Sequence, residues 1–163
     1  MTALPKKPDR ILGDAPERSY AAKLARFEAF AEPELRRLFA GLELPRHGTA
    51  LDLGCGTGRA TGLLAAALGP DVLLIGIDLS LPHLRAARAH TATLVQCDAE
   101  RLCFRGSAFD LIYSCNTIHH IGNRAAYYQT LARDLRDGGR LAIVTAGRID
   151  SGGHQRCAKR GQQ

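Results

Sequence analysis

From position 49 onward, short apolar runs alternate with stretches in which apolar residues recur every three or four positions. The runs at 50–53, 72–78, 94–97, 109–114 and 140–145 have the length and composition of buried strands. The stretches at 57–68, 81–90 and 124–135 have helical spacing. This alternation predicts βαβ units and therefore an α/β fold: a Rossmann-like, doubly wound, mainly parallel sheet of about five strands with flanking helices.

Two helices are expected before the first strand. The apolar spacing predicts a first helix over 20–30 with Ser19 as its N-cap. Pro33 suits the first turn of a second, short helix that ends at Gly41. We therefore expect an N-terminal leader and helical cap at 1–47, a Rossmann-like domain at 48–147 and a flexible basic tail at 148–163.

The composition is that of one soluble globular domain. The chain has 163 residues, of which 45% are hydrophobic and 23% charged. No apolar run approaches the roughly 20 residues of a membrane span, and residues 1–14 lack the apolar core of a secretion signal. The five cysteines form an odd set without a C-x-x-C pair, which suggests neither a disulfide framework nor a metal site. We expect a cytoplasmic protein without a resident metal.

The positive charge is spread along the chain. The formal net charge of +6 is carried by arginines scattered over the predicted helices and by the two ends, not by one dense stripe. A solvated surface explains this distribution better than a nucleic-acid interface does, and we expect no membrane partner.

The most informative local pattern is a glycine turn directly after the first predicted strand. Gly54, Gly56 and Gly58 stand at alternate positions, and the acidic Asp52 precedes them. Glycines can adopt positive φ and carry no Cβ, so we expect backbone amides and the start of the next helix to face a bound polar group. A dinucleotide-binding fingerprint requires Gly-x-Gly-x-x-Gly, and this chain has Arg59 at the place of its last glycine.

With its neighbours, this turn resembles the first motif of the class I S-adenosylmethionine-dependent methyltransferases, in particular the branch with small-molecule acceptors (type 11/25-like). Further segments resemble later motifs of the family in the same order: 75–79, 96–99, 109–121 and 135–144. The resemblance covers about 49–145, and it implies a methyltransferase that uses S-adenosylmethionine as cofactor.

The resemblance also implies a role for each matching residue. Asp78, followed by Leu79, would accept the ribose hydroxyls, and Asp98 with Ala99 would meet the adenine. Asp52 would orient the methionine end, and backbone groups at Cys115 and Asn116 would meet its amino group. The glycine turn, including Cys55, would complete the cofactor site.

Paired histidines follow the fourth predicted strand. Histidine titrates near neutral pH, so His119 or His120 is the candidate base for an acceptor that must lose a proton; the alternative is packing on the cofactor and capping of a turn. The segment lacks the Asp/Asn-Pro-Pro-Tyr pattern of enzymes that methylate nucleobase amines, which argues against DNA as substrate.

The chain departs from the family after the fifth strand, where typical members add a helix and an antiparallel hairpin. Residues 149–163 are too short and too rich in glycine and charge to supply them. We therefore expect the fifth strand to be an exposed edge and to form a homodimer along 141–144, or to leave the fold marginally stable. The alternatives to the small-molecule methyltransferase are a truncated cofactor-binding or interaction module without turnover, and an RNA methyltransferase. An NAD-dependent dehydrogenase fits less well, because the chain also lacks a Tyr-x-x-x-Lys pair.

Overall fold

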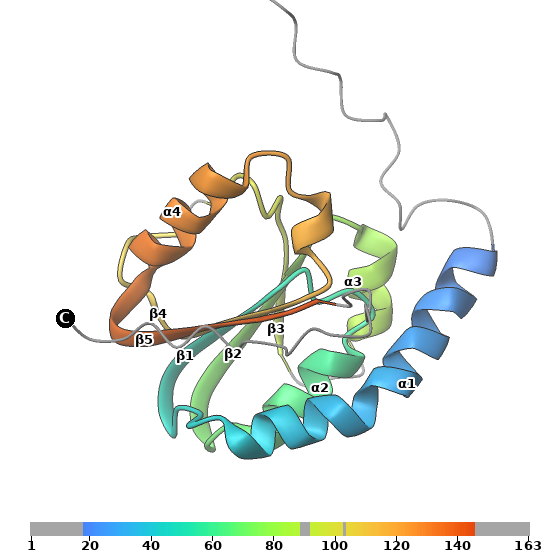
Figure 1. Ribbon diagram of the computed structural model, residues 1–163, viewed down its shortest axis with the longest axis horizontal. Helices are drawn as coiled ribbons and strands as arrows, with labels where there is room; N and C mark the ends of the chain where they lie inside the picture. The colour runs from blue at the N-terminus through green and yellow to red at the C-terminus, as the bar shows by residue number, and fades with distance from the viewer. Residues whose placement is uncertain (1–17, 89–91, 103, 146–163) are drawn as a thin grey trace, which may run out of the picture.

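The computed structural model describes residues 18–88, 92–102 and 104–145. Its elements in chain order are α1 (Arg18–Gly41), β1 (His47–Leu53), α2 (Arg59–Ala67), β2 (Asp71–Asp78), α3 (Leu81–Ala87), β3 (Thr93–Gln96), β4 (Phe109–Cys115), the 3₁₀ turn η2 (Ile118–His120), α4 (Arg124–Asp134) and β5 (Leu135–Val144) (Figure 1). Residues 1–17 of the expected leader and cap at 1–47, and the whole expected tail at 148–163, lie outside the described residues, and the domain boundaries stay predictions.

The strands form one sheet in the order β3-β2-β1-β4-β5, and all four pairings are parallel. This confirms the predicted Rossmann-like α/β sheet of five strands. Within the described residues, β5 is one edge of the sheet and β3 is the other. The carboxyl ends of all five strands therefore lie along one side of the sheet, where ligands bind in open α/β folds.

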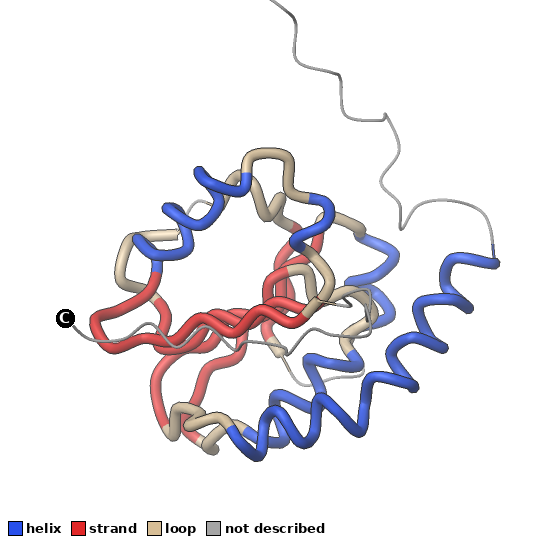
Figure 2. The backbone as a smooth tube through the Cα atoms, viewed as in Figure 1, coloured by secondary structure: helices blue, strands red, loops and turns tan. Residues whose placement is uncertain are grey.

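Helices cover both faces of the sheet, as Figure 2 shows in blue and red. Successive side chains of β1 point to opposite faces of the sheet. Ala50 packs on one face with α1 and α2, whereas Leu51 and Leu53 pack on the other face in the cluster that includes Leu131 of α4. Between Phe109 and Leu111 of β4 the register with β5 is irregular, and these two buried side chains join different clusters, one with Leu131 and the other with Ala50. The sheet is thus buried on two sides, which explains its nearly continuous apolar strands.

The prediction of two N-terminal helices is wrong, because α1 runs unbroken from Arg18 to Gly41 with Pro33 inside it. It also begins before Ser19, the expected N-cap. Proline in a helix interior costs about 3 kcal/mol through a lost hydrogen bond and a clash. Leu35 and Phe39, both nearly fully buried, follow Pro33 on the same helix, and burying such side chains contributes roughly 1.5–3 kcal/mol each. Packing therefore outweighs the local penalty.

Strand and helix ends differ from the prediction where glycines change the backbone. α2 begins at Arg59 instead of position 57, because Gly58 has φ +86° and cannot be helical. β5 begins directly after α4, at Leu135 instead of position 140, and its pairing with β4 shifts from Leu135 to Arg140. Gly138, with φ +77°, makes that shift possible.

Candidate functional site

The glycine turn joins β1 to α2 and has the predicted backbone conformation. Gly54, Gly56 and Gly58 have φ of +77°, +55° and +86°. Their amides, however, already have partners within the protein: Gly54 and Cys55 donate to the carbonyl of Ile77, both at 2.8 Å, and Gly58 donates to the carbonyl of Cys55 at 3.0 Å. These three amides are therefore used within the protein, and the contact of the glycine turn with a ligand stays a prediction.

The turn instead offers bare backbone for close approach. A Cβ on Gly56 would meet nothing within 4 Å, so this position opens to the surroundings. A Cβ on Gly54 would lie 2.1 Å from the hydroxyl oxygen of Thr117, so here the glycine is required by the segment that follows β4.

The ends of β1 and β4 are bound together at one carbonyl. The hydroxyls of Ser114 and Thr117 both donate to the carbonyl oxygen of Leu53, each at 3.0 Å. These contacts fix the segment after β4 against the start of the glycine turn. The two regions that were assigned to the methionine end of the cofactor are therefore neighbours.

Asp52 is a buried acid directly below the turn, with 1% of its surface exposed. The Thr61 hydroxyl of α2 donates to its carboxyl at 2.6 Å. Burial, and to a smaller extent the charge of Asp78, raise the pKa of Asp52 from an ordinary 3.8 to about 7. The hydrogen bond from Thr61 acts in the opposite direction and lowers the pKa. Asp52 can therefore change charge near neutral pH when a ligand charge arrives.

Asp78 ends β2 and links it to the glycine turn. Its carboxylate accepts the Gly56 amide at 2.9 Å on one oxygen and the Ser80 amide at 2.8 Å on the other. Burial alone raises the pKa of Asp78, but the side chain of His83 and the two amides outweigh it, and the pKa lies below its usual range. Asp78 is thus an ionised acceptor, and a carboxylate has about four lone-pair sites, enough for these amides and ribose hydroxyls together. Leu79 is exposed beside it.

Asp98 and Ala99 lie in the loop after β3. Asp98 accepts the amide of Glu100 at 2.9 Å, and its carbonyl accepts the amide of Arg101, which closes a tight turn. Glu100 in turn accepts the amide of Gly122 from the segment after η2. The loop expected to meet the adenine is therefore hydrogen-bonded to the segment that follows η2.

Asn116 follows β4 in a left-handed conformation, with φ +55°. Its amide donates to the carbonyl of Val144 at 2.8 Å, which holds it at the end of β5. Asparagine tolerates this conformation better than most residues, and such positions concentrate at functional sites. Cys115 precedes Asn116 and is half-buried. At Cys55, in the glycine turn, burial raises the pKa of the thiol, which argues against a thiolate nucleophile at Cys55.

His119 and His120 lie on η2 and are both exposed. The ring nitrogen Nε2 of His119 lies 2.6 Å from the hydroxyl of Thr145, beyond the end of β5. His119 is thereby oriented across the carboxyl ends of β4 and β5. The base role of either histidine stays a prediction.

A cavity of about 70 Å³ lies between α1, the glycine turn, the start of α2 and the end of β4. Its lining includes six of the predicted cofactor residues: Asp52, Gly54, Cys55, Gly56, Cys115 and Asn116. Phe27, Ala31 and Leu35 of α1 cover it. α1 therefore covers the part of the predicted cofactor site that lines this cavity.

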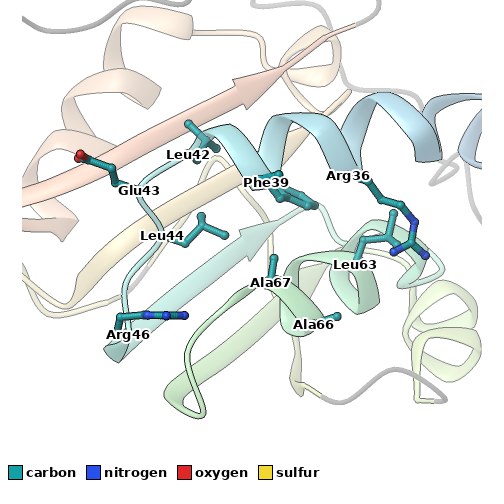
Figure 3. Close-up of a pocket in the computed structure, with 10 residues that line it drawn as sticks. Arg36, Phe39, Leu42, Glu43, Leu44, Arg46, Leu63, Ala66 and Ala67 are labelled. Carbon is teal, nitrogen blue, oxygen red and sulfur yellow. The ribbon is translucent and has the colours of Figure 1, made fainter.

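A second cavity, of about 520 Å³, is larger but lies away from these residues. Figure 3 shows it between the end of α1, the segment before β1 and the second half of α2, with Phe39, Leu44 and Ala67 on its walls. It is at the amino ends of the strands, and its lining includes none of the predicted site residues. We therefore place the candidate site at the smaller cavity.

Several residues of the site escaped the sequence analysis. Each of them contacts a residue of another segment: Thr61 contacts Asp52, His83 contacts Asp78, Glu100 contacts Gly122, and Glu32 contacts Arg59. A polar residue at a helix position that faces the sheet was an available signal for Thr61, and no local signal existed for the others. Among residues 18–88, 92–102 and 104–145, no three His, Cys, Asp or Glu side chains form a group that could hold a metal. No described helix is both long and apolar enough to cross a membrane.

The chain is similar to known methyltransferases. Residues 50–139 match the family described as "Methyltransferase domain". The chain is 40% identical over 95 residues to malonyl-[acyl-carrier protein] O-methyltransferase of Herminiimonas arsenicoxydans, covering 58% of this chain and 36% of that protein. It is 33% identical to 27-O-demethylrifamycin SV methyltransferase of Amycolatopsis mediterranei, covering 66% of this chain and 42% of that protein.

A solved structure is similar as well. Phosphoethanolamine N-methyltransferase 2 of Haemonchus contortus, in complex with S-adenosyl-L-methionine, superposes with a TM-score of 0.58 at 27% identity, over 68% of this chain and 26% of that one. The chain spans less than half the length of each of these proteins.

Proposed function

The chain belongs to the methyltransferase domain family, and on that premise we propose that it transfers a methyl group from S-adenosylmethionine to a small-molecule acceptor. The observation that carries the proposal is the row of carboxylates at the ends of consecutive strands. Three neighbouring strands of the sheet carry these acids at their carboxyl ends. Asp52 is next to the last residue of β1, Asp78 is the last residue of β2, and Asp98 lies in the turn after β3. Such a row suits an elongated ligand with several polar groups.

The residues fit the cofactor in their chemistry. Asp78 is an ionised acceptor with lone pairs for the ribose hydroxyls, and Gly56 leaves room for close approach. The cavity beneath α1 offers Asp52 for an ammonium group. When bound, S-adenosylmethionine supplies a methyl group on a sulfonium, which is already activated for displacement.

The protein's contribution is orientation and exclusion of water. α1 covers the methionine end, and the segment after β4 is held rigidly by Ser114 and Thr117. Orienting two reactants can contribute roughly 7–11 kcal/mol to barrier lowering. For an acceptor that must lose a proton, His119 is the base that we favour, because Thr145 orients its ring across the strand ends.

Calorimetry of S-adenosylmethionine binding tests the cofactor site. We expect binding by the wild type, at least tenfold weaker binding by Asp78→Asn, and unchanged binding by Asp71→Asn, an exposed aspartate at the opposite end of the same strand. Folding of each variant is checked by circular dichroism. A folded wild type that does not bind would refute the enzyme reading.

Acceptor screening then separates the remaining candidates. By their names, one of the two similar methyltransferases acts on malonyl-[acyl-carrier protein] and the other on 27-O-demethylrifamycin SV. These names support a small-molecule acceptor. Transfer of labelled methyl to a component of a metabolite extract would support it. Transfer to RNA would favour the RNA methyltransferase, and binding without any transfer would favour a module without turnover. We place the activity in the cytoplasm because the five cysteines form an odd set without a C-x-x-C pair, which suggests no disulfide framework.

We further propose that two copies associate along β5. β5 is an edge of the sheet among the described residues, and Leu141 on it is 36% exposed. Light scattering after size exclusion should give a dimer for the wild type and a monomer for Leu141→Lys, whose charge opposes edge pairing. A wild type that is monomeric at all concentrations contradicts the dimer and leaves the cofactor site untouched.

A further inference from the structure

The cavity beneath α1 carries one acidic and one basic side chain among its described lining residues, Asp52 and Arg59. Its volume of about 70 Å³ is well below the roughly 300–1,000 Å³ of a pocket for a whole drug-sized ligand. It therefore holds only one end of a nucleoside-sized cofactor. An amino acid end carries one ammonium and one carboxylate, which is the charge pattern complementary to one acid and one base.

Arg59 is positioned for this purpose by the fold. It is the first residue of α2, directly after the glycine turn, where the helix dipole also favours a negative group. Its Nε and Nη2 donate to one oxygen of Glu32 on α1, at 3.1 Å and 2.6 Å. The other oxygen of Glu32 accepts from Arg36, at 2.8 Å and 3.1 Å.

This arrangement orients the guanidinium without using all of it. A guanidinium has five N–H donors and can grip carboxylates along two edges. Glu32 takes the edge formed by Nε and Nη2, so the edge formed by Nη1 and Nη2 can grip a second carboxylate. Glu32 is only 24% exposed at its side chain and Arg59 is 46% exposed, so the pair is partly shielded from water.

We propose that Arg59 is a binding residue of the cofactor site and that it grips the carboxylate of the cofactor's amino acid end. This inference rests on the proposed function and adds to it a residue that the family motifs did not indicate. Asp52, on the opposite wall, receives the ammonium. The two charges thus select a ligand that has an amino acid end over one that has only the adenosine part.

Two ligands separate these contributions. S-adenosylhomocysteine carries the amino acid end, whereas 5′-methylthioadenosine has the same adenosine and thioether without it. We expect Arg59→Gln to weaken binding of S-adenosylhomocysteine about 10- to 100-fold, the range for a charge-assisted hydrogen bond. Binding of methylthioadenosine should stay within about twofold. Arg59→Lys, which keeps the charge but loses the fork, should fall between wild type and Arg59→Gln.

Arg36→Gln is the matched control. Arg36 pairs with the same Glu32 and carries the same charge, but it lines the larger cavity (Figure 3). It should leave the affinities for both ligands unchanged. Equal weakening of both ligands by Arg59→Gln, or of neither, would overturn the role of Arg59 and leave the proposed function standing. A folded wild type that binds neither ligand would refute both. If Arg59→Gln does not fold, the Arg59→Lys comparison decides in the same way.

Discussion

Replacing Asp52 with asparagine should make the stability of the protein less dependent on pH. Asp52 is 1% exposed, and burial raises its pKa from 3.8 to about 7. The folded protein therefore holds this proton more tightly than the unfolded chain does. The corresponding stability is fully present below pH 4 and is lost as the pH rises from about 4 to about 7.

The size of the effect follows from the shift. One pKa unit corresponds to about 1.4 kcal/mol, so a shift of roughly three units corresponds to about 4 kcal/mol. Asparagine cannot ionise, and its carbonyl oxygen can still accept the hydrogen bond that Thr61 gives to Asp52 at 2.6 Å. The free energy of unfolding of Asp52→Asn minus that of the wild type should therefore rise by up to about 4 kcal/mol between pH 4 and pH 8.

Urea unfolding followed by circular dichroism at a series of pH values measures this difference. Taking the difference cancels the titration of all groups that both proteins share. Asp71→Asn, which replaces an exposed aspartate at the start of β2, is the control. A flat profile for Asp52→Asn would show that Asp52 titrates alike in both states. A difference that falls as the pH rises would mean that Asp52 is ionised in the folded protein, which contradicts the reasoning.

Five further substitutions, at four positions, test the backbone of the site and of α1. Gly54→Ala should lower the free energy of unfolding by more than about 2 kcal/mol in urea, because of its positive φ and the Thr117 hydroxyl 2.1 Å from the added Cβ, whereas Gly56→Ala should cost only about 1–2 kcal/mol. Equal losses would contradict the close contact. Asn116→Ala should lower the free energy of unfolding by about 1 kcal/mol and Asn116→Gly by less than about 0.5 kcal/mol, because alanine disfavours the left-handed backbone and glycine does not. Pro33→Ala should raise the thermal midpoint by an amount equivalent to roughly 1–2 kcal/mol, because alanine restores a hydrogen bond inside α1; a lower midpoint would contradict the cost assigned to Pro33 in this helix.

The features that the sequence predicted are those that follow from local pattern. The alternation of strands and helices required the parallel sheet, and the glycine spacing required a turn with positive φ at Gly54, Gly56 and Gly58. Acids placed directly after apolar strands necessarily meet at the carboxyl edge of such a sheet, which is why Asp78 could be singled out.

What could not be predicted depends on which distant segments meet. Pro33 locally indicates a helix start, but the burial of Leu35 against the sheet keeps α1 continuous. The carbonyl of Ile77 takes the amides of the glycine turn only because β1 and β2 pair in one particular register. The ion pair of Arg59 with Glu32 joins residues 27 positions apart on two helices, and neither residue alone indicates it.

The carbonyl of Leu53 has a consequence for the order in which this protein becomes functional during synthesis. Its two donors come 61 and 64 residues later in the chain. A ribosome that has translated β1 to β3 has already made the glycine turn and the acids Asp52 and Asp78, yet nothing holds the turn on its β4 side. Cofactor binding should therefore begin only after the segment through Thr117 has left the exit tunnel and β4 has joined β1. Ligand capture by stalled nascent chains would thus report completion of the sheet and not the presence of the motif.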